Sequence, residues 1–124
     1  MKAILVMLML IGGYASAHQF TPTYPKLDQS YIPNVLKAEM ELFNSRTDVA
    51  FYELQVFDNE WYSVPFAVLE GKVVNVEYLK RKKITVFIRE VDKDRAVYVC
   101  SVSKLIADST NKASIASKIC SKIK

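Results

Sequence analysis

Two cysteines are the residues of this sequence with the clearest capacity for chemistry. Cys100 lies in "VYVCSVSK", where the alternation of side chains indicates an extended strand, and Cys120 lies in "SKICSKIK" near the end. Two cysteines in a small domain pair in an oxidising compartment. A bridge between them would close a loop of about 20 residues and stabilise the fold by about 3 kcal/mol. We predict a Cys100–Cys120 disulfide that fixes the last segment to the strand before it.

The other reactive side chains do not form a catalytic set. His18 is the single histidine, and a nucleophile–histidine pair would have to use it at a flexible end of the chain. The pairs Glu39/Glu41 and Asp92/Asp94 fall on a wet strand face and in a polar turn, so solvated charge is the favoured interpretation. Two thiols and one distant histidine do not supply the four ligands of structural zinc. The sequence predicts a non-enzymatic protein without catalytic residues, metal or other cofactor.

The first residues have the organisation of a secretory signal peptide. Lys2 precedes an apolar run from Ala3 to Ile11, and Ala15-Ser16-Ala17 offers the small residues that signal peptidase accepts. The apolar run is shorter than the roughly 20 residues that span a bilayer, so no stable membrane insertion is expected. We expect residues 1–17 to be removed, leaving a domain over 18–124 in the periplasm or secreted.

Cleavage before His18 would place a histidine at the new amino terminus. An amino-terminal histidine can bind copper through its amine and an imidazole nitrogen, but such sites use a second histidine, which this sequence lacks. Copper handling is therefore the weakest of the functional alternatives.

The charge of the chain is mildly basic. It carries 17 basic and 13 acidic residues, a net charge of +4, and the two signs are interspersed. A solvated surface is favoured over nucleic-acid binding. The cluster "YLKRKKI" (78–84) could meet anionic lipid or an acidic partner, although a solvated basic turn over 80–83 is the favoured interpretation. No nucleic-acid partner is expected.

Short alternating segments separated by turn signals predict an antiparallel β-sandwich. Residues 18–34 contain three prolines and are expected to form an irregular or edge segment. A short strand is expected around Trp61, and 114–124 fits either a strand or a helix. The clear strands are predicted over 35–44, 49–58, 72–79, 84–90 and 96–106.

The final segment is the candidate for partner binding. One face holds Ile115, Ile119 and Ile123, and the opposite parity holds Lys118, Lys122 and Lys124. As an edge strand, the segment could accept another chain by strand addition, with the isoleucines as contacts and the lysines discouraging indiscriminate pairing. The alternative, which the pattern favours, is that the isoleucines fill the protein's own core.

The order of residues over about 36–105 resembles the first domain of periplasmic pilus-assembly chaperones, the PapD-like family. In "MELFNSRTDVAFYELQVFD" a strand ends in Asn44, a polar turn follows, and the next strand carries the aromatic Tyr52; Leu42 and Asp48 belong to the same pattern. Pro65-Phe66 and "RAVYVCSVSKL" resemble the following sections. More loosely, the chain is similar to small secreted proteins encoded by bacteriophages.

This resemblance implies a single immunoglobulin-like β-sandwich that binds a protein partner, such as the strand of a client, along an exposed edge. Pilus chaperones have two such domains and anchor a client carboxylate with basic residues, and neither basic residue has a match in this sequence. The sequence therefore predicts a chaperone-like binding module of unidentified partner and oligomeric state. The alternative is a structural component of an envelope assembly or phage particle.

Overall fold

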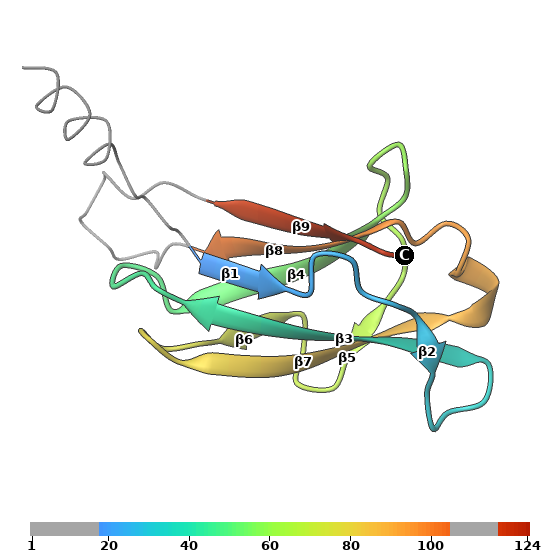
Figure 1. Ribbon diagram of the computed structural model, residues 1–124, viewed down its shortest axis with the longest axis horizontal. Coiled ribbons are helices and arrows are strands. Elements are labelled where there is room, and N and C mark those ends of the chain that lie inside the picture. Colours follow the sequence, from blue (N-terminus) through green and yellow to red (C-terminus); the bar gives the residue numbers. More distant parts are fainter. Residues whose placement is uncertain (1–17, 105–116) are drawn as a thin grey trace, which may run out of the picture.

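A computed structural model describes residues 18–104 and 117–124, which form two antiparallel sheets packed face to face (Figure 1). The expected signal peptide and Ile115 lie outside these residues. The first sheet has the order β1 (His18–Thr21), β3 (Val35–Asn44), β7 (Arg81–Arg89), β5 (Ala67–Val68), with β2 (Asp28–Gln29) also on β3. The second has the order β6 (Val73–Asn75), β4 (Phe51–Phe57), β8 (Tyr98–Lys104), β9 (Lys118–Lys122).

The core lies between the sheets and follows the alternation of the strands. On β3, Ala38, Met40 and Leu42 are buried while Glu39 between them is exposed. On β4, every second residue from Tyr52 onward is buried. Every second side chain of these strands thus points into one layer between the two sheets. The predicted immunoglobulin-like β-sandwich is confirmed.

Two local expectations between β4 and β7 are wrong. No strand forms around Trp61, because the Asp58 carboxylate accepts hydrogen bonds from the main-chain N–H groups of Glu60 (2.8 Å) and Tyr62 (2.9 Å) and holds a turn there. The expected basic turn at 80–83 is largely strand, since β7 begins at Arg81. There Arg81 pairs with Phe43 in register, stacks on its ring and bonds Glu41.

Asp92 also departs from the expected solvated turn. It lies in the 3₁₀ turn η1 (Glu90–Asp92), is buried, and accepts hydrogen bonds from Arg89 and Arg95, both at 2.7 Å. These two guanidinium groups lower the pKa of its carboxyl group. A buried carboxylate is tolerated here because two cations compensate it.

The segment after β1 connects the two sheets, as an edge segment can. β1 pairs with β3 of the first sheet. Further along, the carbonyls of Thr23 and Pro25 accept hydrogen bonds from the main-chain N–H groups of Lys122 (3.0 Å) and Lys124 (2.8 Å), at the edge of the second sheet. Residues 18–25 therefore run along one side of the sandwich, between β3 and β9 (Figure 1). Within 18–104 and 117–124, no helix has the length and apolar character needed to cross a bilayer.

Candidate partner-binding edge

The predicted disulfide joins the last two strands. Cys100 and Cys120 lie directly opposite each other in the β8–β9 register, with an S–S distance of 2.03 Å and a Cα–Cα distance of 4.0 Å. The open question of strand or helix is thereby decided for 118–122, which is a strand. β9 is the last strand of its sheet, so the bridge fixes an edge strand to its only strand neighbour within the described residues.

The side chains of β9 alternate as the sequence indicates. Ile119 and the following Ile123 are partly buried and pack against the core, whereas Lys118 and Lys122 are exposed. Two of the three isoleucines thus contribute to the protein's own core, as the favoured alternative expects. A contribution of these isoleucines to partner binding stays a prediction.

The main chain of β9 is open over part of its outer side. Ser117 O accepts from Ser103 N (2.9 Å), and Ile123 N donates to Val97 O (2.7 Å), so the main-chain N–H and C=O groups of the odd-numbered residues face β8. The main-chain groups of the even-numbered residues face away from β8. Among the described residues, hydrogen-bond partners on that side exist for Lys122 and Lys124 only. The outward main-chain groups of Lys118 and Cys120 have no hydrogen-bond partner among the described residues. β1 packs beside this stretch, so a further strand would have to move β1 aside to pair with these groups.

A buried polar cluster connects β1 and β8 with the residue that precedes β9, beside this edge. The His18 ring lies 2.8 Å from Ser101 Oγ through Nε2 and 3.2 Å from Ser117 Oγ through Nδ1, and Ser103 Oγ accepts from Ser117 N at 2.8 Å. The ring also packs against Tyr52, with a centroid distance of 4.7 Å. β1, β8 and the start of the β9 segment are therefore connected by a single imidazole.

This placement corrects the expectation that His18 lies at a flexible end. Its side chain is only 3% exposed, and burial lowers its pKa to about 4, with the nearby Arg46 charge acting in the same direction. Both ring nitrogens are engaged by hydroxyl groups, and Ser101 is fully buried, so a substrate has no access to this pair. The arrangement suits a structural role. Among the described residues, no three His, Cys, Asp or Glu side chains lie together as metal ligands would.

Asn44, which the family resemblance singled out, organises the neighbouring turn. Its amide donates to the carbonyls of Val49 and Val76, both at 2.7 Å, and its Oδ1 accepts from Arg46 N (2.9 Å) and from the Tyr52 hydroxyl. Burial raises the pKa of Tyr52 to about 12, so the hydroxyl remains a donor. Asn44 and Tyr52 thus contact each other directly, which the sequence pattern alone did not specify.

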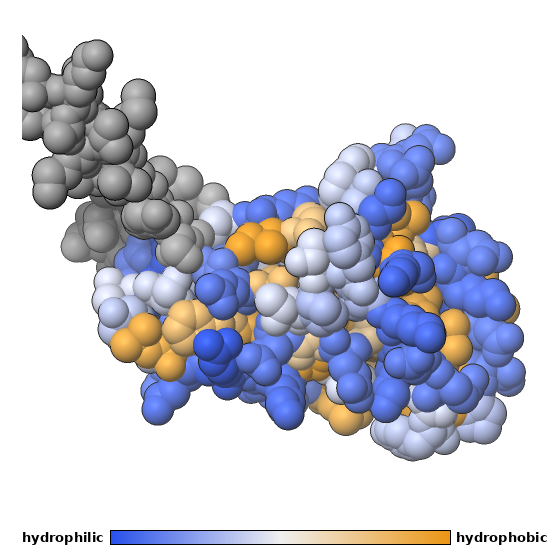
Figure 2. Space-filling view, in the orientation of Figure 1, coloured by the Kyte–Doolittle hydropathy of each residue, from blue (hydrophilic) through white to orange (hydrophobic). Residues whose placement is uncertain are grey.

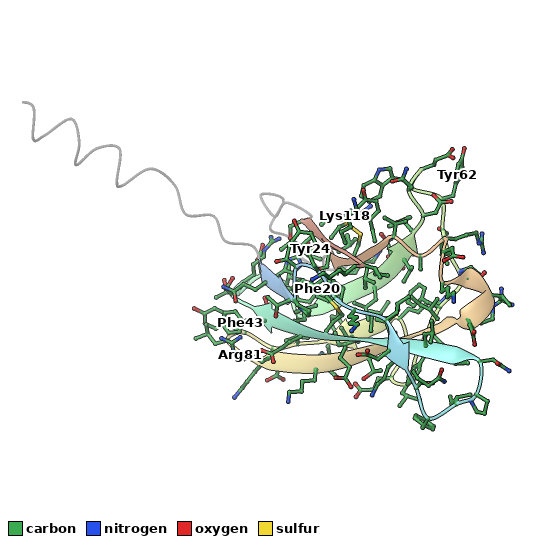
Figure 3. The ribbon with its side chains drawn as sticks, turned by 45° about the vertical axis from the view of Figure 1, so that its right-hand side comes forward. Phe20, Tyr24, Phe43, Tyr62, Arg81 and Lys118 are labelled. Carbon is green, nitrogen blue, oxygen red and sulfur yellow. A yellow bond between two sulfur atoms is a disulfide. The ribbon has the colours of Figure 1, made fainter. Side chains whose placement is uncertain are left out.

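Aromatic rings surround Lys118 on the outer face of the second sheet. Its Nζ lies 4.3 Å from the ring centroid of Phe57 and 5.3 Å from that of Trp61. Trp61 in turn stacks on Tyr98, with centroids 4.2 Å apart. Figure 3 shows Lys118 on β9 and Tyr62 at the tip of the 58–63 loop. Sequence reasoning missed this group because the three rings come from separate segments; the Asp58-Asn59 turn before two aromatic residues is the signal that could have indicated it.

Comparison with solved structures supports the same fold. The crystal structure of the E. coli chaperone DraB superposes with a TM-score of 0.61 at 14% identity, over 86% of this chain and 52% of the chaperone. A PapD-like domain of human CEP192 (PapD-like domain 7) superposes with a TM-score of 0.55 at 7% identity, over 87% of this chain and 82% of that one. No protein-family model and no curated protein sequence matches.

These likenesses establish the fold. The chain is a PapD-like, immunoglobulin-like β-sandwich, as the order of its residues indicated, and it spans about half the length of the chaperone. A fold of this class is consistent with a protein-binding module, and a disulfide is consistent with an oxidising compartment.

Proposed function

We propose that the protein is a secreted or periplasmic, non-enzymatic binding module that receives a strand of a protein partner along the open part of β9. The observation on which this rests is the pair of outward main-chain groups at Lys118 and Cys120, which the described residues leave without partners. A partner strand that moves β1 aside would satisfy these groups by main-chain hydrogen bonds. The signal-peptide pattern of residues 1–17 and the disulfide support export from the cytoplasm.

The surroundings of the edge favour a partner with acidic side chains. Lys118 and Lys122 are exposed and belong to no ion pair within the described residues, and the Lys118 ammonium lies over the rings of Phe57 and Trp61. Opposite charges facing each other across neighbouring strands stabilise a pair by about 0.2–1 kcal/mol. Figure 2 shows this side of the molecule with its apolar residues in separate patches among charged ones, so main-chain pairing is better supported here than burial of one large apolar surface.

In this role the protein acts as a chaperone for one specific client. The fold likeness to the chaperone DraB supports this role. Ile115, Ile119 and Ile123 enter as side-chain contacts that a partner strand could cover at the rim of the core.

The test uses two substitutions at one position. Lys118→Pro removes the outward N–H of Lys118 while leaving the hydrogen bonds to β8 intact, because proline is tolerated on the open side of an edge strand. Lys118→Thr removes the same charge but keeps the N–H. Each oxidised protein serves as bait for an envelope extract of the producing cells, and captured proteins are identified by mass spectrometry.

The proposal predicts one specific protein that both the parent and Lys118→Thr capture and that Lys118→Pro loses. Circular dichroism and thiol titration establish that all three baits are folded and oxidised. Equal capture by Lys118→Pro would overturn strand addition at β9. Recovery of further copies of the chain alone would favour the structural role in an assembly.

A further inference from the structure

A groove on the outer face of the first sheet is separate from the β9 edge. It is lined by Val35 of β3, Phe87 of β7 and Ala67 of β5, together with Ile32, Phe66 and Leu69 from the adjoining segments. Phe87 is nearly buried although it points away from the core, because Tyr31 covers it edge-on with ring centroids 6.1 Å apart. The groove has a volume of about 360 Å³, which is in the range of small-molecule sites.

Among the described residues, Arg89 is the one polar side chain that lines this groove. Its Nε donates to Asp92 Oδ2 at 2.7 Å, while Asp92 Oδ1 accepts from Arg95 at 2.7 Å. Two guanidinium groups therefore share one carboxylate, and one positive charge is left in excess. The described residues offer no partner to the terminal nitrogens of Arg89, whose side chain is 61% exposed. The buried Asp92 thus fixes the Arg89 guanidinium beside the groove and leaves its two terminal nitrogens open to a ligand.

An apolar groove with one guanidinium group beside it determines the chemistry of the ligand that fits. A peptide brings an N–H and a carbonyl with every residue, and this groove has one polar side chain to offer them. An apolar molecule with a single charged end requires one polar contact only. A carboxylate matches that contact, because the two terminal nitrogens of a guanidinium bind both of its oxygens.

We infer that this groove binds a small amphiphilic carboxylate of the medium-chain fatty acid class. The hydrocarbon chain lies over Phe87 and Ala67, where its burial supplies most of the free energy of binding. The carboxylate lies on the terminal nitrogens of Arg89. This site is independent of the strand-binding edge.

The experiment compares two probes that differ only at the charged end. Decanoate and decan-1-ol are titrated into the oxidised protein at pH 7.5, below their aggregation limits, and binding is followed by heteronuclear NMR. We expect saturable binding of decanoate, with shifts at Ala67 and Phe87, and decan-1-ol at least about tenfold weaker because a charge-assisted hydrogen-bonded pair is lost. Absence of saturable binding of decanoate would overturn the inference.

Three substitutions locate the site. Ala67→Phe fills the groove at an exposed position, so the protein is expected to fold and to lose both probes. Arg89→Gln and Arg95→Gln each remove one guanidinium from Asp92, yet only Arg89 lines the groove. Arg89→Gln should abolish the preference for decanoate, and Arg95→Gln should keep it. Equal effects of the two arginine substitutions, or binding to Ala67→Phe within twofold of the parent, would show that the probes bind elsewhere and would overturn the inference.

Discussion

At the scale of the residue, His18 makes the stability of the fold depend on pH. Its pKa is about 4 in the folded protein against 6.5 for a free histidine, because burial disfavours the imidazolium. Protons bind more strongly to the unfolded chain, so this contribution is complete above pH 6.5 and is lost as the pH falls towards 4. The total amounts to about 3 kcal/mol.

Denaturant unfolding at a series of pH values checks this prediction. The parent should lose stability steadily between pH 6.5 and 4.5, a window that lies above the titration of most carboxyl groups. His18→Gln cannot titrate, so its free energy of unfolding should be nearly flat there, from a lower starting value. Parallel slopes for the two proteins would show that His18 is not the group responsible.

Asn44 is the residue whose loss should cost most. Asn44→Ala leaves two buried carbonyls, those of Val49 and Val76, and the Tyr52 hydroxyl without their partner. Each unsatisfied buried group costs about 1–3 kcal/mol, so we expect a loss of at least 3 kcal/mol in the free energy of unfolding. The exposed Asn75→Ala on β6 is the matched control and should change stability by less than about 0.5 kcal/mol. Similar losses for both would contradict the central role of Asn44.

At the scale of the element, the disulfide decides whether β9 remains in its sheet. Replacing Cys100 and Cys120 together by serine should lower the free energy of unfolding by about 3 kcal/mol, the value for a loop of this length. Amide hydrogen exchange of Ile119, Ser121 and Ile123, whose N–H groups face β8, should rise before that of β3. Uniform acceleration across both sheets would instead mean that the bridge stabilises the fold as one unit.

At the scale of the whole molecule, the lysines of β9 keep copies of the protein apart. An open edge strand invites pairing with a second copy, and charged side chains oppose this by repulsion. We expect the double substitution Lys118→Thr and Lys122→Thr to promote dimers at high concentration, measured by light scattering coupled to size exclusion. The same substitutions at the exposed Lys80 and Lys83, at the start of β7 in the other sheet, are the control. Dimers in the control or in the parent would show that another surface associates.

The sequence by itself determined the layers of this protein. The alternation of Ala38, Met40 and Leu42, and the opposite parities of isoleucine and lysine in the last segment, depend only on the period of two of a strand. The pairing of Cys100 with Cys120 followed from their number and from the strand pattern around one of them. The resemblance to PapD-like domains followed from the order of Asn44, Tyr52 and Pro65-Phe66.

Only the tertiary structure decided which groups remain open. The outward N–H groups of Lys122, at the end of β9, and of Lys124 are bound by Thr23 and Pro25 across nearly one hundred residues, which no local period encodes. The burial of His18 between Ser101 and Ser117, and the holding of Arg89 by Asp92 beside an apolar groove, likewise arise where separate segments meet. Local periodicity fixes which face a side chain takes, whereas its neighbours, its charge state and its access to a ligand are set by the packing of distant segments.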